Sequence, residues 1–232
     1  MSIPSVVIIW CDASFETKNS YQSMQDEFNE TTTGVSAQEP DRMDVDIVNE
    51  GTNYFHSNNV PLIVTRTTEE AETEIQKHSK EKIFVICSGT SGRILVPIIS
   101  RNFPYVHDIF IFAHGLAAHT DWTADYKQMV KMFRFHTTLL IRLTHEITKY
   151  FIKQGKNYLQ IGDGSSALKY FKQAQKLEIE ANRRSKTTWN AVETYSNQPD
   201  YRRHLNLLEG SNGLIAQAEN IMRHQELPVQ SH

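Results

Sequence analysis

The sequence has few cysteines and no long apolar run, and both absences narrow what the chain can be. Two cysteines in 232 residues are too few for a disulfide scaffold, which fits a reducing compartment. The longest apolar runs, residues 83–87 and 109–113, are far shorter than the roughly 20 residues of a transmembrane helix. The amino terminus has neither a basic region nor a small-residue cleavage site, so we interpret it as a strand. We therefore expect a cytoplasmic protein with no membrane partner.

The sequence also lacks the mixed basic and aromatic block that is typical of nucleic-acid binding. The net charge of −3 divides unevenly, because residues 16–57 hold nine acidic and two basic side chains and carry −7, which leaves +4 elsewhere. Residues 127–232 hold sixteen Lys or Arg against nine Asp or Glu, spread along predicted helices. A solvated helix face explains this excess better than a nucleic-acid groove.

Short apolar runs alternate with helical patterns through the first two thirds of the chain. The predicted strands are residues 6–10, 61–66, 83–87, 109–113 and 131–135, and the predicted helices are residues 18–30, 68–78, 93–101, 122–128 and 137–151. Continuously apolar strands are typical of a parallel sheet covered on both faces. The pattern predicts an α/β domain with a five-stranded, doubly wound, flavodoxin-like sheet of order 2-1-3-4-5. Right-handed crossovers would place helices one and five on one face and helices two to four on the other.

Two boundaries follow from composition. Residues 31–59 are rich in Thr, Asn and Asp with few large apolar side chains, which predicts a flexible insertion. We expect the α/β domain to occupy residues 1–147 and a helical region to occupy residues 148–232.

Residues 148–181 match most defining positions of the tetratricopeptide repeat, whose length is about 34 residues. Phe151 takes the large aromatic position, and the small Gly155 and Ala167 fall where two helices touch. Gly162-Asp163-Gly164 supplies the turn, while Gln154 and Ile179 depart from the pattern. The segment predicts one helical hairpin, with flanking helices covering its apolar faces.

The first helix of such a hairpin is expected to present the partner-binding face. The residues predicted to line it are Lys149, Ile152, Lys156, Leu159 and Gln160. The positive charge nearby favours an acidic peptide or protein as the partner.

Three segments carry a resemblance to a known family: VVIIWCDAS, KIFVICSGTSGRILVPIIS and VHDIFIFAH. Together they resemble a divergent receiver-like domain at the amino end of large invertebrate multidomain proteins. In that family the domain precedes tetratricopeptide repeats or a mono-ADP-ribosyltransferase domain. The resemblance covers roughly residues 6–147 and implies the flavodoxin-like fold.

Departures from that family limit which activities the resemblance implies. A phosphorylatable receiver has paired acidic residues after strand one and an aspartate ending strand three, whereas this chain has only Asp12 at the first place and Cys87-Ser88 at the second. An ADP-ribosyltransferase needs a Glu-x-Glu loop, but Glu72-Thr73-Glu74 and Glu178-Ile179-Glu180 both fall on predicted helices. Neither aspartyl phosphorylation nor ADP-ribosyl transfer is therefore expected.

Cys87 and Arg93 have the Cys-x5-Arg spacing of cysteine-dependent phosphatases. In that chemistry a strand delivers the thiolate, glycine-rich backbone amides cradle a phosphate, and the arginine binds two of its oxygens. Asp121 or, as an alternative, Asp125 is the candidate general acid. Ile86 and Ile94 stand where those phosphatases have His and a hydroxyl residue, so a small buried residue before a tight turn is the simpler interpretation.

The predicted strand order places Cys11 and Cys87 side by side at the carboxyl edge of the sheet, where open α/β sheets bind ligands. The residues expected to line a small, anion-binding pocket there are Cys11, Asp12, Ser88, Gly89, Thr90, Ser91 and Gly92. His114, His119 and Asp121 lie on one predicted loop, but a metal would need a further convergent ligand. We expect neither a metal nor a cofactor.

The function favoured by the sequence is a non-enzymatic protein–protein interaction or regulatory module. One alternative is the cysteine-dependent phosphatase. Another is a nucleotide-sensing domain of the Toll-receptor-like type, which shares the layered fold but needs a catalytic glutamate that the sequence does not locate.

Overall fold

The computed structural model describes residues 6–13, 60–189 and 200–226. The predicted helix at residues 18–30 and the predicted flexible insertion at 31–59 lie outside these residues. The described part divides into two compact units, the first ending at Leu140 and the second beginning at Ile141. Each unit is described by itself.

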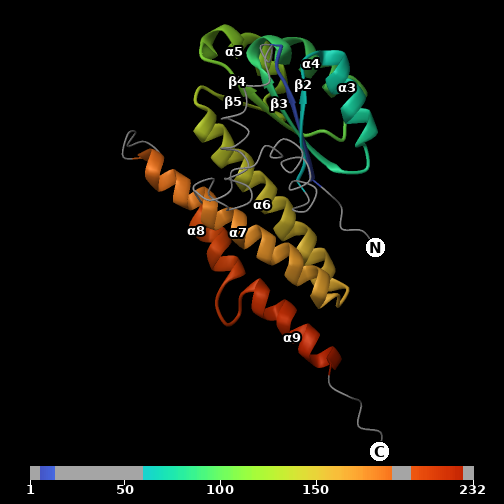
Figure 1. Ribbon diagram of the computed structural model, residues 1–232, viewed down its shortest axis with the longest axis vertical. Coiled ribbons are helices and arrows are strands. Elements are labelled where there is room, and N and C mark those ends of the chain that lie inside the picture. Colours follow the sequence, from blue (N-terminus) through green and yellow to red (C-terminus); the bar gives the residue numbers. More distant parts are fainter. Residues whose placement is uncertain (1–5, 14–59, 190–199, 227–232) are drawn as a thin grey trace, which may run out of the picture. The chain divides into compact units, whose positions relative to one another are not determined.

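The first unit is built on a five-stranded parallel sheet of order β2-β1-β3-β4-β5 (Figure 1). The strands are β1 Val6–Cys11, β2 Leu62–Thr65, β3 Lys82–Ser88, β4 Asp108–Phe112 and β5 Val130–Phe133. Every neighbouring pair is parallel. The α/β class, the five strands and the flavodoxin-like strand order predicted from the sequence are therefore confirmed.

One face of this sheet carries the core under helices α3 Thr68–Lys77 and α4 Gly89–Asn102. Alternate strand residues such as Ile9 and Val85 pack there against Ile75 of α3 and Leu95 of α4, and all four are fully buried. Trp122, from α5 Thr120–Thr123, packs against the same core. The opposite face carries a second buried apolar layer that includes Ile8, Phe84 and Phe110. Burial on both faces explains why the strands are apolar without alternation.

One predicted helix start in this unit is confirmed and another needs correction. α3 begins at Thr68, as predicted, and the hydroxyl of Thr67 caps it by accepting a hydrogen bond from the amide of Glu70. The turn predicted over residues 88–92 is wrong, because α4 begins at Gly89, directly after β3 ends at Ser88. The predicted loop at 114–121 contains a short 3-10 helix, Leu116–His119. A second one, Ala124–Tyr126, follows α5.

Ion pairs link the amino-terminal ends of three neighbouring strands. The carboxylate of Asp108 on β4 accepts hydrogen bonds from Lys82 on β3 at 2.7 Å and from Lys131 on β5 at 3.0 Å. The same ammonium groups lie over aromatic rings, Lys82 at 4.9 Å from the centroid of Phe84 and Lys131 at 5.3 Å from that of Phe110. We call Lys82, Asp108 and Lys131 the charged trio.

The second unit consists of helices. α6 runs His136–Gln160 and enters this unit at Ile141, followed by α7 Gly164–Trp189, α8 Asp200–Leu208 and α9 Leu214–Glu226. α6 is one continuous helix, so the boundary predicted between residues 147 and 148 falls inside it. None of the described helices is both long and apolar enough to cross a membrane.

α6 and α7 form the predicted hairpin. Gly162 has φ +77°, a left-handed conformation that glycine adopts at little cost, and α7 begins two residues later. A Cβ at Gly155 would collide with the ring of Phe171, so the small residue on α6 permits the close approach of α7. Tyr158 and Tyr170 stack across the hairpin with ring centroids 5.6 Å apart.

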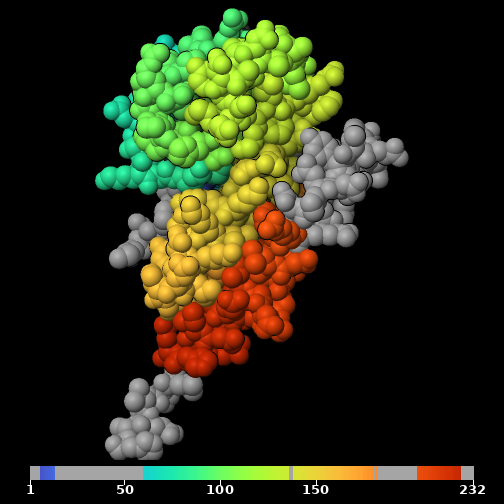
Figure 2. All heavy atoms as spheres, turned by 180° about the vertical axis from the view of Figure 1, so that it is seen from behind, coloured from blue at the N-terminus to red at the C-terminus, as the bar shows by residue number. Residues whose placement is uncertain are grey.

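α7 is the central helix of this unit. On one side it packs closely against α9, because a Cβ at Gly164 would lie 2.7 Å from the carbonyl oxygen of Ala218. The side-chain amide of Gln175 donates a hydrogen bond of 2.9 Å to the carboxylate of Glu209, just beyond α8. Figure 2 shows the atoms of α9, in red, lying against those of the hairpin, in yellow to orange.

Candidate binding site at the carboxyl edge of the sheet

The site predicted at the carboxyl edge begins with two cysteines on neighbouring strands. Cys11 ends β1, Cys87 lies one residue before the end of β3, and the two are direct partners in the β1–β3 register. Both thiols are unbonded and fully buried. The predicted proximity of the two residues is therefore confirmed.

The side-chain hydroxyls of Thr65 and Ser91 lie beside the Cys11 thiol. Cys11 donates a weak hydrogen bond of 3.4 Å to the carbonyl oxygen of Thr67, and its sulfur also interacts with the side chains of Thr65 and Ser91. Burial raises the pKa of the Cys11 thiol, and the hydrogen bonds from Thr65 and Ser91 offset only part of that rise. The pKa of Cys87 is raised well above its ordinary value, chiefly by burial and further by the neighbouring Cys11. Both sulfurs are therefore thiols, not thiolates, at neutral pH.

The predicted phosphate-binding turn is the first turn of α4. The hydroxyl of Ser88 caps the helix by accepting from the amide of Ser91, and it also donates to the Ser91 hydroxyl at 3.0 Å. Thr90 is exposed, whereas Gly89, Ser91 and Gly92 are buried. Ser88 thus bonds to Ser91 within the turn, and the Ser91 side chain also bonds to the Cys11 thiol.

A side chain that was not predicted to line this site covers the turn. A Cβ at Gly89 would collide with the imidazole of His119, so the ring lies directly against the start of α4. The indole nitrogen of Trp122 donates to Nδ1 of His119 at 3.3 Å and holds the ring in place. An anion approaching the first amides of α4 would have to displace or contact this imidazole.

Side chains of the sheet and of α5 pack so closely against Gly92 that a larger residue would not fit. A Cβ there would lie 2.6 Å from Cδ1 of Ile111, 3.3 Å from the sulfur of Cys87 and 3.3 Å from the ring of Trp122. The glycine therefore lets α4 approach the sheet closely, and it does not form the tight turn that the sequence predicts. Asp12 follows β1 and is half-buried, and its amide donates to the carbonyl oxygen of Thr65 at 3.1 Å.

The residues proposed for phosphatase chemistry occupy different environments. Cys87 is 0% exposed, while Arg93 and Asp121 are exposed. Within the described part of the chain, no hydrogen bond or ion pair joins any two of these three side chains. The backbone between Cys87 and Arg93 is a strand end and a helical turn, so its amides do not form a phosphate-binding loop.

The partner-binding residues predicted on α6 differ in exposure. Lys156 and Gln160 are exposed, and Lys149 and Leu159 are partly exposed. Ile152 is only 6% exposed, so it packs within the chain and the accessible face is narrower than predicted. Lys149 pairs with Glu146 one turn earlier, at 3.5 Å. Lys153, which is not among the residues predicted for this face, is exposed on the same side of the helix.

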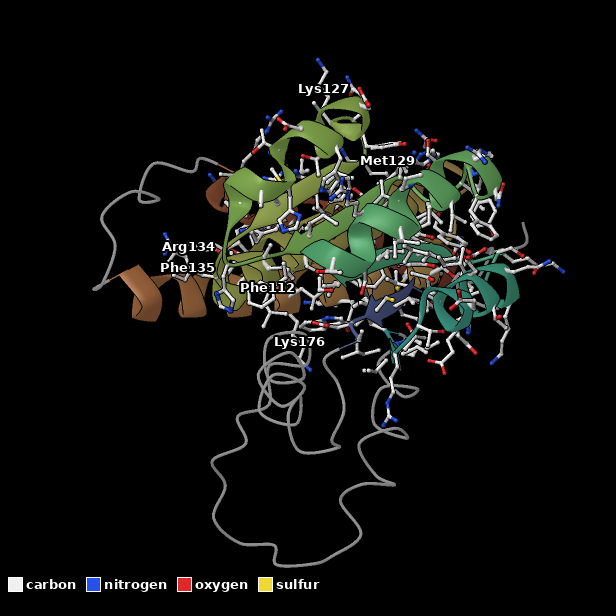
Figure 3. All side chains as sticks on the ribbon, turned by 90° about the horizontal axis from the view of Figure 1, so that it is seen from above. Phe112, Lys127, Met129, Arg134, Phe135 and Lys176 are labelled. Atoms are coloured by element: carbon white, nitrogen blue, oxygen red, sulfur yellow. The ribbon has the colours of Figure 1, made fainter. Side chains whose placement is uncertain are left out.

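A second exposed feature, also missed, lies where β4 and β5 end. The guanidinium of Arg134 lies 5.6 Å from the ring centroid of Phe135, and Phe135 is 57% exposed. Phe112, at the end of β4, packs edge-on against His114. Figure 3 shows Arg134 and Phe135 together at the rim of this unit. The signal available in the sequence was an Arg-Phe pair directly after a strand.

Comparison with known proteins gave no match. No protein-family model, no curated protein and no solved structure matches the chain.

Proposed function

We propose that the chain is a non-enzymatic binding module whose helix α6 presents a basic face to an acidic peptide or protein segment. The observation that carries this proposal is a row of cations along one side of α6. Lys149, Lys153 and Lys156 follow one another at intervals of four and three residues, so their side chains lie on the same face. Gln160 extends the row by one more turn.

The row ends beside an apolar side chain. Ile161 directly follows α6 and is 76% exposed, the largest value among the large apolar side chains that the structure describes. Leu159, one turn after Lys156, is partly exposed. An acidic segment with one apolar residue would match both the lysine row and Ile161, because apolar anchors supply contact energy and charges supply steering and register.

We further propose that the chain belongs with the receiver-like domains followed by tetratricopeptide-type repeats. Strand order, the residues of β1, β3 and β4, and the Gly155–Phe171 contact of the hairpin support this assignment. The two unbonded thiols fit a cytoplasmic location.

A binding role is favoured over catalysis at the carboxyl edge of the sheet. A phosphatase needs an accessible thiolate, whereas Cys87 is fully buried and its pKa is raised well above the ordinary value by that burial. The glutamate whose charge acts on Cys11 at this edge is Glu70, and its carboxylate accepts a hydrogen bond from the backbone amide of Arg66 at the start of α3, which does not favour the nucleotide-sensing alternative.

Selection from a library of displayed peptides tests the proposal although the partner is unidentified. Immobilised protein should enrich peptides rich in Asp and Glu with one apolar residue, and their affinity should fall as the ionic strength rises. The variant Lys153→Glu/Lys156→Glu should lose most of this binding, because it reverses the charge at the centre of the row.

The matched control is Lys172→Glu/Lys176→Glu, which makes the same charge change at two exposed residues of α7. It should retain most of the binding. Equal losses in the two variants would show that net charge alone attracts the peptides, and enrichment of no acidic sequence would overturn the proposal.

A further inference from the structure

Three buried side chains from three helices converge within the second unit. His145 lies on α6, Glu178 on α7 and His204 on α8, and one candidate ligand atom from each lies within 4.8 Å of the others. Glu178 is 0% exposed, and each histidine is 8% exposed. We call these residues the His–Glu–His cluster.

Both imidazoles direct the same nitrogen at the carboxylate. Nδ1 of His145 lies 3.1 Å from Oε1 and 3.2 Å from Oε2 of Glu178, and Nδ1 of His204 lies 3.3 Å from Oε2. Oε1 is buried and accepts no hydrogen bond from the described residues. One carboxylate oxygen therefore points into the cluster without a hydrogen-bond donor.

The electrostatics of the cluster also favour a cation. A fully buried carboxylate is costly unless opposite charge or donors compensate it. Within the described residues, the ion-pair partners of Glu178 are the two imidazoles, with no lysine or arginine. A dication would compensate the charge of this carboxylate. Two neutral imidazoles could bind such an ion through the ring nitrogens that already face Glu178.

We infer that His145, Glu178 and His204 bind one Zn²⁺ ion. Zinc takes His nitrogen and carboxylate oxygen at about 2.0–2.2 Å, and tetrahedral geometry then places neighbouring donors about 3.3 Å apart. The separations of 3.1 Å and 3.3 Å between the imidazole nitrogens and the carboxylate oxygens fit that spacing. The ion would link α6, α7 and α8 through side chains that already lie inside the unit.

The sequence alone does not reveal this cluster, because its residues are far apart in the chain. Intervals of 33 and 26 residues match no short metal-binding motif, and only the hairpin and α8 bring the three together. Glu178 was considered only as part of a Glu-x-Glu sequence on a predicted helix.

Zinc uptake by metal-free protein tests the inference. We expect the full chain, freed of metal with a chelator, to bind one Zn²⁺ per chain in calorimetry and in competition with a chromogenic chelator. X-ray absorption of the bound zinc should show nitrogen and oxygen ligands at about 2.0–2.1 Å and no sulfur. Thermal unfolding should move to higher temperature as zinc is added, because the ion binds the folded state.

The variant His204→Gln separates metal binding from hydrogen bonding. A glutamine amide can still donate to Glu178, so the helices keep a polar link, but it is a poor zinc ligand. We expect its zinc affinity to fall at least about 100-fold, since even changes to groups behind the ligands cost 10–100-fold. The matched control is His224→Gln, because His224 is exposed on α9 and bonds only to the carbonyl oxygen of Asn220.

Three results would overturn the inference: no stoichiometric zinc binding by the unaltered chain, unchanged affinity in His204→Gln, or sulfur among the ligands. The last would place the ion at Cys11 or Cys87. Should His204→Gln fail to fold, the uptake and X-ray absorption of the unaltered chain still decide the question.

Discussion

Cys11 and Cys87 occupy the same register position on neighbouring parallel strands, and neither is bonded. Neighbouring strands lie about 4.8 Å apart, which is within the range of Cα separations that a disulfide can span. Both side chains are nevertheless core residues with 0% exposure. The pair therefore contributes to packing, and its reactivity is a sensitive probe of whether the carboxyl edge of the sheet is closed.

We expect both thiols to resist alkylation in the native protein. Burial excludes the reagent and raises the pKa of each thiol, most strongly that of Cys87, so the reactive thiolate is scarce. Iodoacetamide labelling followed by peptide mass spectrometry should show slow modification in buffer and rapid modification of both sites in denaturant. Rapid native-state labelling of Cys87 would contradict the closed edge and restore the phosphatase alternative.

Gly155→Ala should destabilise the helical unit. The added methyl would collide with the fully buried ring of Phe171, and overpacking of this kind costs about 1–3 kcal/mol. The helix preference of alanine returns up to about 1 kcal/mol, so the net free energy of unfolding should fall. Urea denaturation followed by circular dichroism measures the change.

The matched control for this glycine is Gly115→Ala. Gly115 has φ −106°, and a methyl added there would have no neighbouring atom within 4 Å, so the substitution should leave the urea midpoint nearly unchanged. A Gly155→Ala protein as stable as the unaltered chain would show that α6 and α7 do not approach as closely as described.

Asp108→Asn should lower the free energy of unfolding at neutral pH by about 1–3 kcal/mol, because charge-assisted hydrogen bonds of the charged trio are weakened. Burial raises the pKa of the Asp108 carboxyl, but the hydrogen bonds and charges of Lys82 and Lys131 outweigh it and leave the pKa lowered. The stabilisation is thus complete above the unfolded-state pKa of about 3.9 and is lost as the pH falls through the lower folded-state value.

Urea midpoints measured from neutral to acidic pH test this sign. The difference between the unaltered protein and Asp108→Asn should shrink toward zero in acid. Asp125→Asn serves as the control, since Asp125 is exposed in the same unit and should show no comparable effect at any pH. A difference that persists in acid would mean that the asparagine perturbs packing and not charge.

Hydrophobic pattern alone was enough to predict the sheet. The strands around Ile8, Phe84 and Phe110 are continuously apolar because both of their faces are buried, and that property leads directly to a parallel order. The predicted turn at 88–92 failed because glycines usually signal a turn, whereas Gly89 and Gly92 are needed for the contacts of α4 with His119 and Ile111. Sequence shows that a residue is small without showing what lies against it.

The sites were less predictable than the fold. The pairing of Cys11 with Cys87 follows from strand order, so it could be inferred. The position of His119 over the first turn of α4 depends on how a loop folds back, which no local pattern encodes. The His–Glu–His cluster depends on the packing of three helices and is invisible without their arrangement.

The charged trio has a consequence for folding accuracy as well as for native stability. Asp108 points to the sheet face that carries Phe84 and Phe110, while the next residue, Ile109, belongs to the core under α3 and α4. If β4 paired one residue out of step, Asp108 would enter that apolar core and both lysines would lose their shared acceptor. The three side chains therefore raise the free energy of a shifted register of β4, which favours the native alignment of the strands as the sheet forms.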